Sequence, residues 1–187
     1  ITKQAKGMIA HEILILSDDP AHPNQALNML EVPQLRPGQT LPDVAYQTAA
    51  GKSVSIQQTF SGSVGVLLIA AHACPVAFKA LSAARRDLTP YLNKIQVIGI
   101  DPWDKPGLTP ETQIYDYGFP MLFSALTTKD DHGWSEVLDL HFGQPILAGP
   151  PMPVVYVVGS DGKIVLAQWG YESGAVLSAV EAALGGP

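Results

Sequence analysis

Apolar runs in the middle of the chain predict a βαβ unit. The run VGVLLIAA at Val64–Ala71 is apolar throughout, which favours a strand covered on both faces, and Lys94–Asp101 is a second buried strand. Between them, apolar residues recur at mostly helical spacing over Val76–Leu92, where Pro90 is expected to end or kink the helix. The two strands should therefore run parallel with a right-handed crossover. The apolar positions of the helix are Val76, Phe78, Leu81, Leu88 and Leu92.

Alternating polar and apolar positions predict a hairpin on either side of this unit. The first is VAYQTAAGKSVSI, which starts at Val44 and turns at Ala49–Lys52. The second runs over Val154–Gln168 around a Ser-Asp-Gly turn at 160–162. The closing segment ESGAVLSAVEAAL predicts an amphipathic helix, and its apolar side consists of Val176, Leu177, Val180 and Leu184.

The remaining segments are less regular. FPMLFSAL predicts a short strand, TPE at residues 109–111 begins a short helix, and DDHGWSEVLDLHFG predicts a longer one. Residues 1–41 are rich in turns and lead into VPQLRPGQTLPD, a segment with three prolines, so we interpret them as an extension. Within it, MIAHEILIL fits either an edge strand or a helix. We therefore expect an extension at 1–41 and one domain at 42–187.

Composition supports a globular domain and disfavours several classes of partner. The 187 residues are 47% hydrophobic, with a mean hydropathy of +0.15, which is enough for a full core. The net charge of −6 and the absence of a basic cluster larger than Arg85-Arg86 argue against nucleic acid as a partner. No apolar stretch is long enough to span a bilayer, and no signal-peptide pattern is visible.

The single cysteine, Cys74, lies at the junction of the first buried strand and the following helix. A thiol at a helix N-terminus is stabilised as thiolate by the macrodipole and nearby backbone N–H groups. Pro75 suits the first helical turn, and His72 points to the same side as Cys74 if the strand continues that far. The alternative is a buried cysteine that acts as a small hydrophobic residue, with His72 merely ending the strand.

The order of these elements, with a cysteine at the junction, resembles the thioredoxin fold. More narrowly, it is similar to the redoxin branch that includes alkyl-hydroperoxide-reductase/thiol-specific-antioxidant proteins. Four stretches carry the resemblance: LRPGQTLPDVAYQTAAGKSVSI, GVLLIAAHACPVAFKAL, PMPVVYVVGSDGKIV and WGYESGAVLSAVEAAL. It implies a thioredoxin-like three-layer α/β/α sandwich with a mixed central sheet. The N-terminal extension and an insertion at 104–150, before the strand led by a cis-proline, are additions to that fold.

The resemblance also implies the residues of a redox site. Cys74 and His72 would be catalytic, with the imidazole tuning the thiolate. Pro75, Met152 and Pro153 would contact the substrate, and Pro153 matches the cis-proline that faces the cysteine in the family. The expected function is reduction of a peroxide or a disulfide by Cys74. A thioredoxin-like or glutathione-like external thiol would regenerate Cys74, a protein is a possible substrate, and no cofactor is expected.

Two departures limit the resemblance. Ala77 stands where a C-x-x-C site has its second cysteine, so Cys74 has no resolving thiol within the chain. The chain is then a monothiol enzyme, a variant engineered to trap intermediates, or a protein that has lost redox function. Leu67 and Ala71 replace the Pro and Thr found upstream of a peroxiredoxin cysteine, which argues against efficient peroxide reduction.

A second function class stays open on the same residues. In a redox-inactive binding or accessory protein, or a metallochaperone, Cys74 is inert or a ligand. His72, Cys74, His132 and His141 are the residues that would have to converge on a metal, but their spacing matches no metal motif, so we expect none. The lack of disulfides fits a cytoplasmic protein, or an extracytoplasmic one if a signal sequence was removed. The sequence indicates no oligomeric state.

Overall fold

The computed structural model describes residues 14–16, 26–28, 35–70, 74–101, 117–123 and 153–185. The chain divides into two compact units, Ile1–Val32 and Pro33–Pro187. In the first unit, β1 (Leu14–Leu16) pairs antiparallel with β2 (Ala26–Asn28). The described part of MIAHEILIL is therefore a strand. The predicted division at residue 41 stays a prediction.

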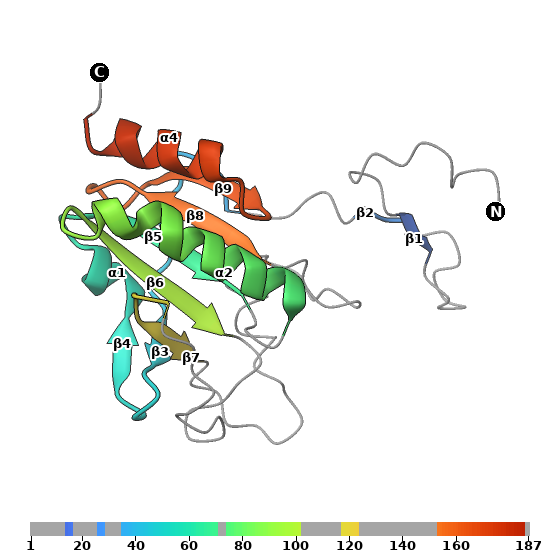
Figure 1. Ribbon diagram of the computed structural model, residues 1–187, viewed down its shortest axis with the longest axis horizontal. Helices are drawn as coiled ribbons and strands as arrows, with labels where there is room; N and C mark the ends of the chain where they lie inside the picture. The colour runs from blue at the N-terminus through green and yellow to red at the C-terminus, as the bar shows by residue number, and fades with distance from the viewer. Residues whose placement is uncertain are drawn as a thin grey trace. The chain divides into compact units, whose positions relative to one another are not determined.

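A seven-stranded mixed sheet forms the centre of the second unit (Figure 1). Its strands lie in the order β4-β3-β7-β6-β5-β8-β9, where β5, β6 and β7 run parallel and all other neighbours are antiparallel. This arrangement confirms the two predicted hairpins, the parallel βαβ unit and the short strand in FPMLFSAL. The strands are β3 (Ala45–Gln47), β4 (Ser53–Ser55), β5 (Val64–Ile69), β6 (Ile95–Asp101), β7 (Met121–Phe123), β8 (Val154–Val158) and β9 (Ile164–Trp169).

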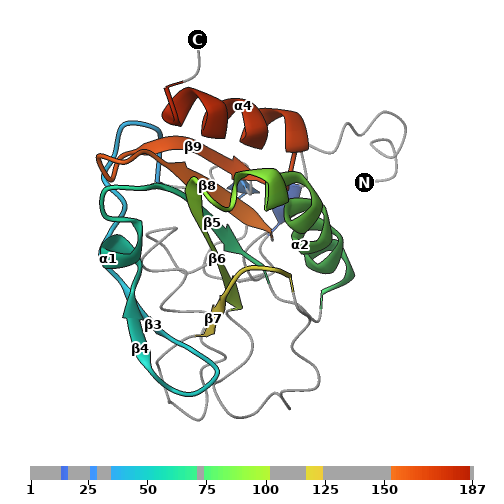
Figure 2. The ribbon, with the colours of Figure 1, turned by 60° about the vertical axis from the view of Figure 1, so that its left-hand side comes forward.

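Helices lie on both faces of this sheet (Figure 2). The helices α2 (Pro75–Leu88) and α4 (Ser173–Ala183) share one hydrophobic cluster with alternate residues of β5, including Val64 and Val66. Gly65 lies between those two valines and faces the other way, where a Cβ would be 2.6 Å from the Phe60 ring of α1 (Ile56–Phe60). Because side chains alternate along a strand, α1 covers the opposite face. The predicted α/β/α layering is confirmed.

The buried face of α2 differs from the predicted one. The helix was expected to bury its largest apolar residues, yet Val76 is 62% exposed and Phe78 is 36% exposed. Alanines take their place because a helix that lies close to a sheet needs small side chains at the contact. Leu92 lies beyond the helix, which ends at Leu88 and continues as a 3-10 turn over Thr89–Tyr91. The buried residues of α2 are Ala77, Ala80, Leu81, Ala84 and Leu88.

The C-terminal helix follows its prediction more closely. Val176 and Val180 are fully buried, and Leu177 is packed against the same cluster. Leu184 was expected on this face, but it follows the last residue of α4 and is exposed. The predicted helices near residues 109–115 and 130–143 lie outside the described residues.

Residues 38–41, ahead of the first hairpin, pair with the second hairpin next to the start of β9, which is an edge strand of the sheet. Its backbone exchanges hydrogen bonds with the second hairpin: Gly38 N–H donates to Ile164 O at 2.8 Å, and Leu41 N–H donates to Gly162 O at 3.1 Å. Thr40 forms a bridge with Lys163, and the Leu41 side chain is buried. These residues are therefore part of the second unit's structure.

Candidate functional site

Cys74 is the N-cap residue of α2. Its backbone is extended, with φ −86° and ψ 122°, and its carbonyl accepts the Phe78 N–H at 2.8 Å. The thiol makes no capping hydrogen bond, and the side chain is half-buried against the cluster beneath α2. Pro75 occupies the first turn, as predicted, where its missing N–H has no partner to lose.

Cys74 stands at the positive end of the α2 dipole. The N-terminus of α2 carries the positive end of the macrodipole, and the first turn contains no acidic residue that would offset it. Arg85 and Arg86 lie in the last turn, where they complement the negative end of the same dipole.

Pro153 lies at the same edge of the sheet as the end of β5. Ile69 pairs with Val154, so Pro153 is beside the chain that leads to Cys74. Pro153 is buried, and its carbonyl accepts the Gly170 N–H at 2.7 Å. Pro153 and the end of β5 that leads to Cys74 thus lie at the same edge of the sheet. Two more of the predicted site residues, His72 and Met152, lie outside the described residues.

Ala77 occupies the position of the absent second cysteine, and its side chain is fully buried in the cluster that Cys74 also contacts. It lies three residues after Cys74, which is one helical turn. A thiol at this position would lie beneath Cys74 on the covered side of the helix.

Asp101 is a feature of this edge that the sequence analysis did not use. It is 1% exposed and is the last residue of β6, opposite the residue after Ile69 in the neighbouring strand. Side chains alternate between the two faces of β6, so Asp101 lies on the same face as Val97. This is the face that α2 covers. The sequence signal for this buried carboxyl is an aspartate at the end of an otherwise apolar run.

An aromatic group extends the site along α2. Phe78 contacts Tyr117 edge-on with ring centroids 6.3 Å apart, and Tyr117 stacks with Phe119 at 6.0 Å. Tyr117 is buried, while Phe78 reaches the surface one turn after Cys74. Residues 78 and 117 are far apart along the chain, so no local pattern predicts this contact.

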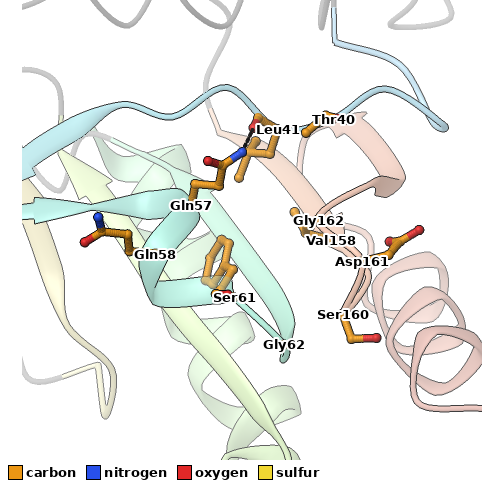
Figure 3. Close-up of a pocket in the computed structure, with 11 residues that line it drawn as sticks. Thr40, Leu41, Gln57, Gln58, Ser61, Gly62, Val158, Ser160, Asp161 and Gly162 are labelled. Carbon is orange, nitrogen blue, oxygen red and sulfur yellow. Dashed lines mark hydrogen bonds between the residues drawn. The ribbon is translucent and has the colours of Figure 1, made fainter.

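A pocket of about 520 Å³ lies at the opposite edge of the sheet (Figure 3). Leu41, Phe60 and Val158 supply its apolar part, and Gln57 Nε2 donates to the Leu41 carbonyl at 3.5 Å. The pocket borders the start of β5, whereas Cys74 follows its end, so the length of the strand, about 20 Å, separates them. The pocket is therefore not part of the cysteine's site.

The described residues contain no group of three or more His, Cys, Asp or Glu that could hold a metal ion. Of the residues that would have to converge on a metal, His72, His132 and His141 lie outside the described part. None of the helices in that part is long and apolar enough to cross a membrane.

Neither a protein-family model nor a curated protein matches this chain. Solved structures do match. The thioredoxin domain of a thiol-disulfide oxidoreductase from Bacteroides vulgatus aligns with a TM-score of 0.59 at 18% identity, over 78% of this chain and 99% of that one. The chain has a thioredoxin-like fold. This confirms the predicted fold class and, at the level of the fold, the resemblance to thioredoxin-fold proteins.

Two further matches show how varied the proteins on this fold are. A yeast mitochondrial 1-Cys peroxiredoxin aligns with a TM-score of 0.59 at 21% identity, over 79% of this chain and 76% of that one. BsSco, a member of the Sco family of cytochrome c oxidase assembly proteins, aligns with a TM-score of 0.55 at 19% identity, over 79% and 95%. At these identities the likeness establishes the fold, and the function has to be argued from the site.

Proposed function

We propose that this protein is a thiol-dependent oxidoreductase in which Cys74 alone carries the redox chemistry. The observation that carries the proposal is the position of Cys74 as the half-buried N-cap of α2, at the edge where Pro153 also lies. A thiolate there is stabilised by the helix end and borders solvent. No cofactor is required for this chemistry.

The reaction is three successive thiol-disulfide exchanges. The Cys74 thiolate attacks one sulfur of the substrate disulfide, forms a mixed disulfide with it and releases the other sulfur as a thiolate. The thiolate of an external thiol, of thioredoxin or glutathione type, then attacks the substrate sulfur of this mixed disulfide. Cys74 is released, and a mixed disulfide between the external thiol and the substrate forms. A second external thiol reduces that mixed disulfide, and only then has the substrate disulfide gained two electrons. The external thiols end as a disulfide.

A disulfide is favoured over a peroxide as the substrate. Leu67 and the alanine at position 71 leave the cysteine without the Pro and Thr of a peroxiredoxin site. Val76 and Phe78 are exposed beside Cys74, and an apolar surface there suits a substrate larger than a peroxide, such as a protein.

The remaining site residues have supporting roles in this proposal. We propose that Pro153 and Met152 contact the substrate from the side opposite the thiol and that Pro75, which is exposed, also contacts it. His72 stabilises the thiolate or delivers a proton to the departing sulfur. All four act by contact with the reacting sulfur atoms or the substrate chain.

A redox-inactive accessory function is the second candidate. Cys74 packs against the hydrophobic cluster, and Ala77 leaves no partner thiol on α2. A cysteine in that setting can act as a small hydrophobic residue. In this case the thiol reacts no faster than an ordinary buried cysteine.

Turnover of a small neutral disulfide separates the two candidates. Wild-type protein should accelerate the reduction of 2-hydroxyethyl disulfide by glutathione, and mass spectrometry should detect a mixed disulfide on Cys74. Cys74→Ser should lower the rate to that of glutathione alone, while Ser82→Ala, at an exposed position on α2, should keep it. Equal rates for wild type and Cys74→Ser would rule out the enzyme, and faster turnover of hydrogen peroxide than of the disulfide would contradict the substrate class.

A further inference from the structure

The solvent face of α2 joins the cysteine to an apolar and basic surface. Phe78 and Arg85 are seven residues apart, so they lie on the same face of the helix, two turns from each other. The Arg85 side chain extends over the segment that carries the aromatic group, because a Cβ at Gly118 would be 3.9 Å from Arg85 Nε. Phe78, Arg85 and the 117–119 segment therefore form one continuous surface, called here the Phe78–Arg85 surface.

The aromatic contacts hold the apolar part of this surface in place. Phe78 rests edge-on against the buried Tyr117, which stacks on Phe119. A ring fixed in this way offers a partner apolar area with little loss of conformational entropy on binding. Phe78 is one turn from Cys74, close enough to contact a residue beside the attacked disulfide.

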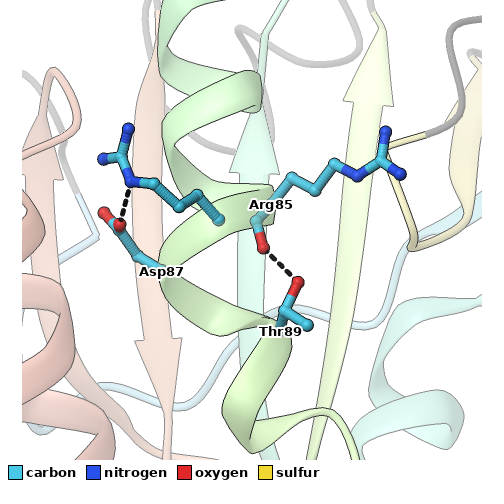
Figure 4. A network of polar contacts seen from close by, with 4 residues as sticks. Arg85, Asp87 and Thr89 are labelled. Carbon is cyan, nitrogen blue, oxygen red and sulfur yellow. Dashed lines mark hydrogen bonds and ion pairs between the residues drawn. The ribbon is translucent and has the colours of Figure 1, made fainter.

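The charge of α2 is opposite to that of the chain. The protein has a net charge of −6, yet α2 carries Lys79, Arg85 and Arg86 against a single acid, Asp87. Arg86 Nε donates to Asp87 Oδ1 at 2.8 Å, and the Asp87 side chain is only 9% exposed. Figure 4 shows Asp87 and Arg85 on opposite sides of the helix. By its own residues, α2 thus carries a net positive charge.

We propose that the Phe78–Arg85 surface binds the segment of a protein substrate that follows the disulfide attacked by Cys74, and that it selects an apolar and acidic segment. This rests on the proposed function. Along the helix axis, Phe78 is about 6 Å and Arg85 about 16 Å from Cys74. An extended chain covers these distances in about two and five residues. The preferred substrate therefore has an apolar residue about two positions, and a carboxylate about five positions, from its cysteine.

Peptides activated as 2-pyridyl mixed disulfides provide the test. Their cysteine is followed by Phe or Ser at the second position and by Glu or Lys at the fifth. The wild-type rate constant for pyridinethione release at low salt should be about 3- to 10-fold higher for Glu than for Lys, as expected of an exposed charge pair. It should also be higher for Phe than for Ser. A salt concentration of about 1 M should remove the charge preference and retain the apolar one.

Variants assign the preferences to the two residues. Arg85→Glu should reverse the Glu-over-Lys ratio, Arg85→Gln should bring it close to one, and Phe78→Ser should remove the Phe-over-Ser ratio. Each ratio is taken within one variant, so a change in overall reactivity cancels. Lys94→Glu makes the same charge change as Arg85→Glu at an exposed position outside α2, and it should keep both ratios.

A small neutral substrate distinguishes failure of the inference from failure of the proposed function. The 2-hydroxyethyl 2-pyridyl disulfide has the same leaving group and no peptide. If Cys74 reacts with it but the wild type treats Glu and Lys peptides alike, the docking surface is wrong and the enzyme stands. If Cys74 reacts no faster than the same thiol in the unfolded chain, the proposed function fails and the surface with it.

Discussion

At the scale of single residues, Ala77 determines how Cys74 would be regenerated. The alanine is fully buried under the helix turn that begins at Cys74. Because residues three apart on a helix have Cα atoms about 5–6 Å apart, a second thiol at this position would meet the geometry of a disulfide. The chain has the arrangement of a two-cysteine site but lacks the resolving sulfur.

Ala77→Cys should convert the chain to internal resolution. Oxidation should then give an intramolecular disulfide, seen as a mass loss of two hydrogens and the absence of alkylation. The mixed disulfide between Cys74 and the substrate should become too short-lived to isolate. The added sulfur is expected to cost about 1–3 kcal/mol of stability in the packed cluster. Ala80→Cys, at another buried position of α2, is the control; an equal yield of disulfide in that variant would contradict the geometry.

Gly65 is a second residue at which packing leaves no room for a side chain. A Cβ there would lie 2.6 Å from ring atoms of Phe60, which is closer than packed carbon atoms approach. Gly65→Ala should therefore lower the free energy of unfolding by about 1–3 kcal/mol, measured by urea denaturation. Gly174→Ala, in α4 with nothing within 4 Å of the added Cβ, should be neutral or stabilising by up to about 1 kcal/mol. A loss of stability in the second variant but not the first would contradict this packing.

At the scale of elements, the carboxyl of Asp87 at the end of α2 is influenced by Ser173 at the start of α4. Burial raises the pKa of its carboxyl, but the Ser173 hydroxyl and the Arg86 guanidinium outweigh burial, so the pKa lies below its ordinary value of 3.8. A carboxyl with a lowered native pKa stabilises the fold above its unfolded pKa and loses this contribution as the pH falls through the native value. The link should therefore weaken only in acid.

Asp87→Asn should lower the free energy of unfolding by about 1 kcal/mol at neutral pH, a modest amount because Arg86 is 72% exposed and water screens the pair. The difference from wild type should shrink as the pH falls below about 4, because the native pKa lies below the ordinary value of 3.8. Urea denaturation across this range measures it. Asp161→Asn removes the same charge at the exposed hairpin turn and controls for net charge. A difference that grows as the pH falls would show that the pKa has the opposite shift.

The sequence predicted strands better than helix faces. Uninterrupted apolar runs identified β5 and β6 because both faces of these strands are buried. The face of α2 was wrong because hydrophobicity favoured Val76 and Phe78, whereas the spacing between helix and sheet favoured the alanines. Likewise, Cys74 and Pro75 could be placed from a local junction. The contacts of Asp101 and Tyr117 depend on pairing between distant segments, which a single sequence does not encode locally.

At the scale of the whole molecule, the segment around Leu41 shows where the folded unit begins. Leu41 is 2% exposed, and Gly38 and Leu41 hydrogen-bond the second hairpin. Residues up to Val32 form a separate compact unit. A chain that starts at Pro33 should therefore keep the stability of the seven-stranded sheet, and one that starts at Pro42 should not.

Thermal unfolding of the two truncated chains measures this difference. Loss of the Leu41 side chain alone is expected to cost about 2–5 kcal/mol, which lowers Tm by about 5–15 °C for a domain of this size. Leu41→Ala in the full chain should reproduce most of the effect. Equal Tm values for the two truncated chains would instead support an extension that ends at residue 41.

The account depends most on Cys74 being a reactive thiol, and its alkylation rate tests this directly. Reaction of the native protein with iodoacetamide at pH 7 should be at least about threefold faster than reaction of the same chain unfolded in urea, because the helix end stabilises the thiolate. A native rate no faster than the unfolded rate would contradict the account, and a native rate below about one tenth of it would identify Cys74 as a buried structural residue.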